Sequence, residues 1–299
     1  MSAKWKQRRN SELAGAGRRK TEQRAFATAN SQAIDGVVKD LGPDPGSNAG
    51  GGACVVFNMS NENITKFCAV HGGPGVKAYL NAYDLEALSI RTGATPKQVS
   101  ERRRKVDHAV QKITGIPAQD IYFGAVEVNG SGMRFYGDYC LVLKVARASE
   151  WVLDRNSWDI ARPPLANGNL LDGPMQWAVQ SISGKWDEDL AHMLVVKVFT
   201  SVRVSSRRLT TGQISNAVLN DEDYLEVLRQ GSFSADDVAE VRTSATESAR
   251  DASIGDRAAH GPIPSFAELQ WRQRRLQAER ALNQRNLDVR VVTAPGRIR

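Results

Sequence analysis

The sequence has little cysteine and little histidine, which excludes several kinds of site. Its 299 residues include three cysteines, Cys54, Cys68 and Cys140, which are widely spaced and form no C-x-x-C pair. The usual redox motif and the usual zinc motifs are therefore missing. Four histidines are scattered without an H-x-x-x-H or H-x-E spacing, so no metal site is predicted. We expect the three cysteines to be reduced and buried.

Long hydrophobic runs are missing as well. No window approaches the roughly 20 consecutive apolar residues that a membrane-spanning helix needs, and the N-terminal segment lacks the apolar core of a secretory signal. Hydrophobic residues make up 41% of the chain and charged residues 24%, as in an ordinary folded protein. We therefore expect a cytoplasmic protein that does not associate with membranes. The oligomeric state stays open.

The positive charge lies at the two ends of the chain. The chain carries +7 in total; residues 1–24 contribute +6 and residues 268–299 contribute +5, which leaves a mildly acidic middle. Basic ends attract the phosphates of a nucleic acid, although they can also serve solubility alone. We expect a nucleic acid, or a protein bound to one, to contact these ends. The candidate residues are Lys4, Lys6, Arg8, Arg9, Arg18, Arg19, Lys20, Arg272, Arg274 and Arg275.

Composition divides the chain into three parts. Residues 1–50 are expected to form a flexible basic arm that ends in the linker-like LGPDPGSNAGGG, with part of it, around 11–39, expected to be helical. Residues 51–242 are expected to form a core domain. Residues 243–299 are expected to hold a polar loop, 243–262, followed by a basic helix. The predicted fold class is α+β, with a mixed or antiparallel sheet and packed helices.

The helices expected near the sheet have clear end signals. One helix is expected over 76–90. Another begins at Thr95, a capping residue, and ends at Gly115. Its run ERRRK spreads four cations around the helix, which indicates a solvated face. The C-terminal helix begins at Ser265, and its expected apolar positions are Phe266, Leu269, Leu276 and Leu282.

Several β-prone runs predict the strands. DIYFGAVEV and MRFYGDYCLVLKV are joined by NGSG, which indicates an antiparallel hairpin. The apolar run EDLAHMLVVKVFTSVRV indicates a central strand, and short helices follow around an acidic cluster at 211–228. The expected strands are 53–60, 120–128, 133–145, 151–165 and 188–204.

Arg134 lies in the most strand-like of these runs. A buried arginine needs a carboxylate or carbonyl partner, because an unpaired buried charge costs several kcal/mol. Asp138 points the same way along a strand but lies about 13 Å away. The possible partners are Glu127, Asp120 or a bound anion. Alternatively, Arg134 extends to solvent from the edge of the sheet.

A family resemblance suggests a function for Arg134. MRFYGDYCLVL, RRLTTGQIS and NDEDYLEVL together resemble the arginine, serine/threonine and glutamate set of ADP-ribosyltransferases, and YGDYCLVLKV followed by VLDRNSWD resembles strand pairs of phage-linked and polymorphic-toxin members. The resemblance covers about a third of the chain. It implies that Arg134, Thr210 and Thr211 bind NAD, the substrate, and that Glu222 or Glu226 stabilises the oxocarbenium-like centre as nicotinamide leaves.

Two alternatives remain beside this reading. A second branch of the same superfamily uses a His-Gly pair with a tyrosine, and His71-Gly72 with Tyr79 or Tyr83 is similar to it. The other alternative is a protein without enzymatic activity, such as a phage- or chromosome-associated assembly component whose basic arms bind DNA or RNA. The G-x-S-x-G, H-E-x-x-H and kinase motifs do not occur in the sequence.

Overall fold

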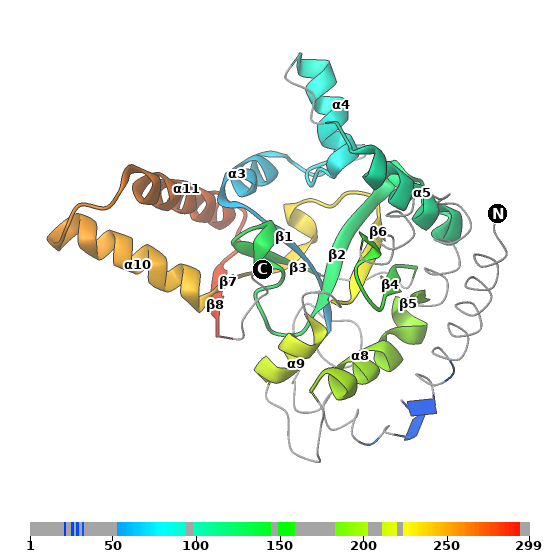
Figure 1. The fold of residues 1–299 in the computed structure, drawn as a ribbon. Coiled ribbons are helices and arrows are strands. Elements are labelled where there is room, and N and C mark those ends of the chain that lie inside the picture. The colour runs from blue at the N-terminus through cyan, green and yellow to red at the C-terminus, as the bar shows by residue number, and fades with distance from the viewer. Residues whose placement is uncertain are drawn as a thin grey trace.

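The computed structural model describes residues 53–73, 75–93, 98–144, 149–158, 183–202, 211–219 and 224–293, together with residues 21, 25, 26, 28, 29 and 32. These residues include one sheet of eight strands in the order β5-β4-β6-β2-β1-β3-β7-β8 (Figure 1). Neighbouring strands are antiparallel, except for the parallel pair β7 and β8. Helices pack against this mixed sheet, so the predicted α+β class is confirmed.

Strand β1 (Cys54–Met59) lies at the centre of the sheet, between β2 (Ile121–Glu127) and β3 (Tyr139–Leu143). Every residue of β1 is buried, which suits its nearly continuous apolar run. The strands predicted at 53–60 and 120–128 are confirmed. The expected hairpin of β2 with β3 is wrong, because both strands pair with β1 and not with each other.

The side chain of Asn58 explains how the chain crosses from β2 to β3. Its Nδ2 donates to the carbonyl oxygens of Ser131 at 3.0 Å and Gly137 at 3.1 Å, and its Oδ1 accepts from the backbone N–H of Met133 at 2.7 Å. Gly132, with φ +66°, has no space for a Cβ, which would lie 2.1 Å from Asn58 Oδ1. The NGSG segment is therefore part of a crossover held on β1.

The sheet extends outward on both sides of this centre. Beside β2 lie β6 (Glu226–Gln230), β4 (Trp151–Leu153) and β5 (Ser183–Lys185). Beside β3 lie β7 (Val238–Ser244) and β8 (Val289–Val292). Because β8 follows the last helix, the C-terminal segment returns to the sheet and joins it.

Strand alternation separates the two faces of the sheet. Tyr122 and Val126 of β2 point into the larger apolar core, where they pack with buried residues of four helices. These helices are α3 (Asn61–Ala69), α8 (Trp186–Val202), α9 (Thr211–Val218) and α11 (Phe266–Asn283). In the described part of the chain, this face of the sheet is covered by more helices than the opposite face.

The opposite face carries helix α5 (Glu101–Thr114) at one end. Ile121 and Phe123 of β2 point to this helix and form a smaller apolar cluster with it. The helix ends at Gly115, which has the left-handed conformation predicted for it. It begins after Ser100, whose side chain accepts from a backbone N–H of the first turn, whereas the predicted capping residue Thr95 lies outside the described residues.

The central strand predicted at 188–204 is wrong, because this segment lies largely in α8. Asp187, Glu188 and Asp189 occupy the first turn of the helix, where negative charge interacts favourably with the helix dipole. An apolar run is compatible with either a buried strand or a buried helix, and periodicity alone does not separate them. The acidic turn before the run was the available signal for a helix.

The polar loop predicted at 243–262 is also wrong, because it forms helix α10 (Ala245–His260). Ser244 caps this helix by accepting from the backbone N–H of Glu247 at 3.2 Å, and its many alanines favour helix. The short helices predicted at 211–228 are correct only for α9. The described residues that follow, from Glu226 onward, form strand β6 instead.

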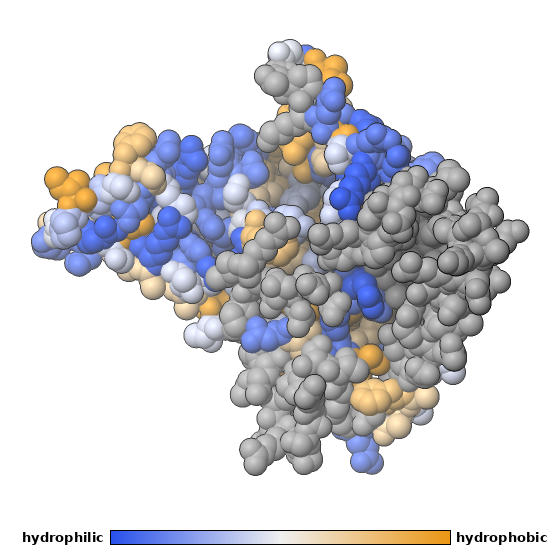
Figure 2. Space-filling view, viewed as in Figure 1, coloured by the Kyte–Doolittle hydropathy of each residue, from blue (hydrophilic) through white to orange (hydrophobic). Residues whose placement is uncertain are grey.

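Helices α10 and α11 form a hairpin that projects from the body of the protein (Figure 1). The predicted start of α11 is confirmed, since Ser265 and Glu268 make a reciprocal cap. The predicted apolar positions are mostly wrong: Leu282 is buried, but Phe266 is 81% exposed, and Leu269 and Leu276 are exposed too. At the projecting end of the hairpin, Figure 2 shows hydrophobic atoms next to hydrophilic ones.

Two further sequence predictions concern burial and membranes. All three cysteines are buried and none forms a disulfide bond, as expected. No helix among the described residues is long and apolar enough to span a membrane. The basic arm predicted at 1–50, with its helix at 11–39, falls almost entirely outside the described residues.

Candidate functional site

Glu226 is the first residue of β6 and lies inside the protein, opposite Ala125 of β2 and Leu153 of β4. Its Oε2 accepts a hydrogen bond from the backbone N–H of Ser157 at 2.9 Å. Burial raises the pKa of Glu226 to about 7, although Arg103 and Ser157 act to lower it. A carboxyl group with this pKa can hold or release a proton near neutral pH.

Helix α5 brings a cation and a second carboxyl group to the same place. Arg103 Nε lies 2.8 Å from Asp107 Oδ1, and the Tyr83 hydroxyl donates to Asp107 Oδ2 at 3.0 Å. The guanidinium stacks on Phe123 at 3.9 Å and attracts both Asp107 and Glu226. Burial raises the pKa of Asp107, against the opposing effects of Arg103 and Tyr83. The positive charge of Arg103 is thus shared between two buried carboxyl groups. Because Asp107 also repels a negative charge on Glu226, the protonated form of Glu226 is favoured.

Two tyrosines lie near Glu226. The hydroxyl of Tyr224 donates to Glu226 Oε1 at 3.4 Å, and Tyr136 is close enough to raise the pKa of Tyr224. Tyr224 is buried, whereas Tyr136 is 54% exposed and packs on Phe135. We name Glu226, Arg103, Asp107 and Tyr224 the acid cluster.

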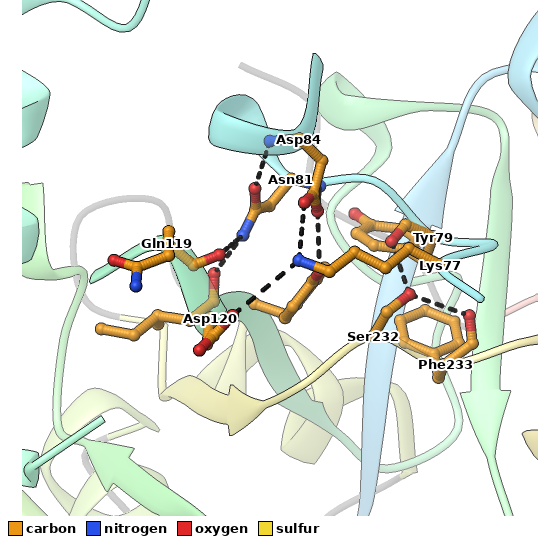
Figure 3. A network of polar contacts seen from close by, with 10 residues as sticks. Lys77, Tyr79, Asn81, Asp84, Gln119, Asp120, Ser232 and Phe233 are labelled. Atoms are coloured by element: carbon orange, nitrogen blue, oxygen red, sulfur yellow. Dashed lines mark hydrogen bonds and ion pairs between the residues drawn. The ribbon is translucent and has the colours of Figure 1, made fainter. Parts of the chain in front are cut away.

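A second polar network fixes the helix that supplies Tyr83 (Figure 3). Asn81 caps α4 (Ala82–Thr92) by accepting from the backbone N–H of Asp84 at 2.9 Å. Lys77 Nζ lies 2.7 Å from Asp84 and 3.8 Å from Asp120, which directly precedes β2. The helix starts later than the predicted 76–90 because this cap lies at 81. The network joins α4 to the sheet and so fixes the position of Tyr83, which lies on this helix.

Arg134 does not lie on a strand. It begins the short 3-10 helix η2 (Arg134–Tyr136), and its Nη2 lies 2.5 Å from Oε1 of Glu247 on α10. The partners expected from the sequence are wrong: Glu127 instead binds the Ser215 hydroxyl at 2.8 Å, and Asp120 lies beside Lys77. The alternative of extension to solvent is wrong as well, because the Arg134 side chain is only 8% exposed.

His71 is exposed, and its Nδ1 lies 3.1 Å from Nη1 of Arg285. The tyrosines considered with it are engaged elsewhere. Tyr79 packs against the larger core, and Tyr83 binds Asp107. No hydrogen bond joins His71 to either tyrosine within the described contacts.

The remaining predicted NAD-binding and catalytic residues are only partly described. Thr210 and Glu222 lie outside the described residues, and Thr211 begins α9 without a described side chain. Three of the predicted side chains are described, those of Arg134, His71 and Glu226. Among the described contacts, no hydrogen bond or ion pair joins any two of them.

The predicted nucleic-acid-binding residues differ in their surroundings. Arg272 pairs with Asp251 at 3.3 Å. Arg275 is buried, lies over the Tyr139 ring and donates to the Thr243 hydroxyl at 3.4 Å, so it does not face solvent. Arg274 is exposed, 3.7 Å from an exposed glutamate of α3. The residues predicted in the N-terminal arm, Lys4, Lys6, Arg8, Arg9, Arg18, Arg19 and Lys20, lie outside the described residues.

The sequence predicted a solvated face for the cations of α5, and Arg102, Arg104 and Lys105 are exposed, whereas Arg103 is partly buried. Arg102 stacks over Trp158 at 4.8 Å, Arg103 over Phe123, and Arg104 over Tyr83 at 5.6 Å. Each arginine therefore joins α5 to a different neighbouring segment, through a cation–π contact that also packs the methylenes of the side chain.

Sequence reasoning found Glu226 but missed the groups around it. Asp107 directly follows the buried Val106 on the apolar side of α5, and Arg103 lies one turn before it. A carboxylate within an apolar stripe, with a cation four residues earlier, was the available signal. Tyr224 lies two residues before Glu226, so an extended chain directs both side chains to one face.

No group of three or more metal-ligating side chains occurs among the described residues. Comparison of the chain with family models, with curated proteins and with solved structures found no match. The acid cluster is therefore interpreted from its own geometry.

Proposed function

We propose that this protein is an NAD-using enzyme of the ADP-ribosyltransferase type, a toxin or effector that acts on a macromolecule in the cytoplasm. Its catalytic carboxyl group is Glu226. The observation that carries the proposal is a buried glutamate with a pKa of about 7, beside a cation and a second carboxyl group. Residues with such strongly shifted pKa values are concentrated at functional sites.

The residue types of the acid cluster suit the chemistry of ADP-ribosyl transfer. As nicotinamide leaves NAD, positive charge develops on the ribose, and a nearby carboxylate stabilises it. The carboxylate of Glu226 would supply that charge and accept a hydrogen bond from a ribose hydroxyl. Arg103 would hold the Glu226 carboxylate in place and offset the charge of Asp107. Thr210, Thr211 and His71 remain proposed contacts for NAD.

The proposal changes the role first expected for Arg134. Its guanidinium is engaged by Glu247, so we assign it to the fold. The cation nearest the catalytic carboxyl is then Arg103, on a helix, whereas the resemblance to ADP-ribosyltransferases places an arginine on a strand. This departure makes NAD binding the first point to test.

The test is incubation of the full chain with labelled NAD and cell extract, followed by detection of label on protein and on nucleic acid. Glu226→Gln should lose transfer while it remains folded. Glu127→Gln is a matched control, because Glu127 is equally buried on the neighbouring strand but lies outside the acid cluster. Failure of the unmodified protein to bind NAD in a titration contradicts the proposal.

A second candidate function, nucleic-acid binding, is supported by the exposed face of α11. Arg274 and Arg280 lie on this face, and none of the exposed residues of α11, a helix described throughout, is acidic. Gln270, Gln273 and Gln277 complete the polar part of the face. Arginine and glutamine can contact a nucleic-acid backbone through charge and hydrogen bonds; Glu62 of α3, 3.7 Å from Arg274, is the carboxylate that a phosphate would have to displace there.

Binding of a DNA or RNA duplex over a range of salt concentrations tests this second function. The double variant Arg274→Gln/Arg280→Gln should bind more weakly and with a smaller salt dependence, since two phosphate contacts are lost. Arg91→Gln, at an exposed arginine of α4, is the control and should bind as the unmodified protein does. Equal binding by the double variant and the control excludes α11 as the contact.

A further inference from the structure

Helix α11 exposes large apolar side chains along one line. Phe266 is 81% exposed, Leu269 39% and Leu276 37%, and Ile263, just before the helix, is 90% exposed. Residues three and seven positions apart lie on the same side of a helix, so the three side chains of α11 form one row. Exposed apolar surface gathered in this way marks a contact with another molecule.

The row continues through Gln273 and Arg280, which follow Phe266 at intervals of seven residues and are exposed. We name Phe266, Leu269, Gln273, Leu276 and Arg280 the α11 stripe. Steps of three and four residues alternate along it, and helices with this repeat pair side by side with another helix. The opposite side of α11, which includes Ala278 and Leu282, is buried, so the stripe faces away from the body of the protein.

The sides of the stripe offer little to repel a neighbouring helix. Gln270 and Gln277, on one side, are exposed and uncharged. On the other side, Arg272 and Glu279 each lie in an ion pair within the hairpin. The one charge in the stripe itself is that of Arg280, in the last turn of the helix.

The charge of Arg280 decides which way a second copy can lie. In a parallel pair of α11 helices, Arg280 would lie beside Arg280 of the other copy. In an antiparallel pair centred on Gln273, it lies opposite Phe266 of the other copy, because both residues are seven positions from the centre. The two arginines are then about 21 Å apart along the helices, beyond the screening length of about 8 Å in physiological salt. An arginine against a phenylalanine ring is a favourable contact, which this protein already makes between Arg103 and Phe123.

We propose that this protein forms a two-fold symmetric dimer through the α11 stripe, with the two helices antiparallel and Gln273 at the axis. Leu269 of each copy then packs near Leu276 of the other. Because the hairpin projects from the body, a second hairpin can lie along it (Figure 1). Such a contact uses the same surface on both copies, so it closes at two. It involves neither the acid cluster nor NAD and therefore goes beyond the proposed function.

The experiment is sedimentation equilibrium of the full chain, treated with nuclease, over a range of protein concentrations. The unmodified protein should show a dimer that dissociates on dilution. Phe266→Arg places a second cation opposite Arg280, so it should raise the dissociation constant by about a hundredfold or more. Ile90→Arg, the same change at an exposed apolar residue of α4, is the matched control and should associate as the unmodified protein does.

A compensating change tests the orientation of the pair. The double variant Phe266→Arg/Arg280→Glu should associate again, because opposite charges then meet in an antiparallel pair, whereas a parallel pair would bring like charges together. The melting temperature of each monomer should stay unchanged, since both side chains are exposed.

Three results overturn the proposal. The first is a monomer at every concentration, and the second is undiminished association of Phe266→Arg. The third is a failure of the double variant to recover. Association that is lost on nuclease treatment also overturns it and assigns the stripe to a nucleic acid, whereas a failure of NAD binding leaves the dimer unaffected.

Discussion

Two buried glutamates on neighbouring strands, Glu226 and Glu127, show how different the surroundings of one residue type can be in one sheet. Both are fully buried, and burial raises the pKa of each. Glu127 is enclosed by contacts near the end of its strand, with the backbone N–H of Val128 at 2.6 Å and the Ser215 hydroxyl at 2.8 Å. Glu226 accepts a hydrogen bond from Tyr224 and lies beside Arg103, which also pairs with Asp107. Glu127 likewise lies near an arginine, Arg242, which pairs with Glu240. The two glutamates therefore share burial and a nearby cation, and they differ in their hydrogen-bond partners.

The largest effect should come from the shared cation. Arg103→Met leaves Asp107 and Glu226 buried without their guanidinium, which should cost about 4 kcal/mol of unfolding free energy and raise the pKa of both acids. Urea unfolding measures the loss. Arg102→Met on the same helix is the control and should cost about 1 kcal/mol or less, since its cation–π contact is at the surface. Equal losses in the two variants would show that Arg103 acts only by packing.

The next effect is a dependence of stability on pH. Folding raises the pKa of Glu226 from 4.5 to about 7, so between these values the folded protein binds more protons than the unfolded chain. Stability should therefore fall as pH rises through this window, by up to about 3 kcal/mol. Chemical unfolding at several pH values measures this dependence. The unfolding free energy of Glu226→Gln should no longer fall between pH 4.5 and about 7, whereas that of Glu127→Gln should keep the part of the fall that is due to Glu226. A slope unchanged in Glu226→Gln would place its pKa outside the window.

Glu247, which forms an ion pair with Arg134, is a third glutamate to compare with Glu226 and Glu127. Arg134→Lys keeps the charge but loses the planar donor, and the pair is largely buried, so it should cost about 2 kcal/mol of stability. A thermal melt measures this loss. NAD binding should stay unchanged. The opposite signature, a lost affinity for NAD with an unchanged melting temperature, would return Arg134 to the binding site.

The smallest expected effect concerns the closed surroundings of Glu127. Ser215→Ala removes one hydroxyl donor from its carboxyl group and should cost about 1 kcal/mol, the usual net value of a buried hydrogen bond. Chemical unfolding measures it. Activity and the pKa of Glu226 should not respond to this change. A response of either would mean that the two glutamates belong to one network.

Local chemistry in the sequence was enough for several features. The apolar runs of β1 and β2 predicted buried strands, Ser265 predicted the start of α11, and Gly115 predicted the end of α5. These features depend on backbone preferences and caps within a few residues. Glu226 was named only through the resemblance to ADP-ribosyltransferases, on a segment expected to hold short helices, whereas it lies on strand β6.

Only the tertiary structure decided the strand order and the partners of the buried charges. The turn signal NGSG is local, but β2 and β3 each pair with β1, which lies between them and is buried throughout. Arg134 pairs with Glu247 across 113 residues of sequence. The acid cluster is drawn from two separate segments, α5 and the stretch from Tyr224 to the start of β6. Desolvation, which makes such charges seek partners, depends on the whole packed core and is not a property of any short stretch of sequence.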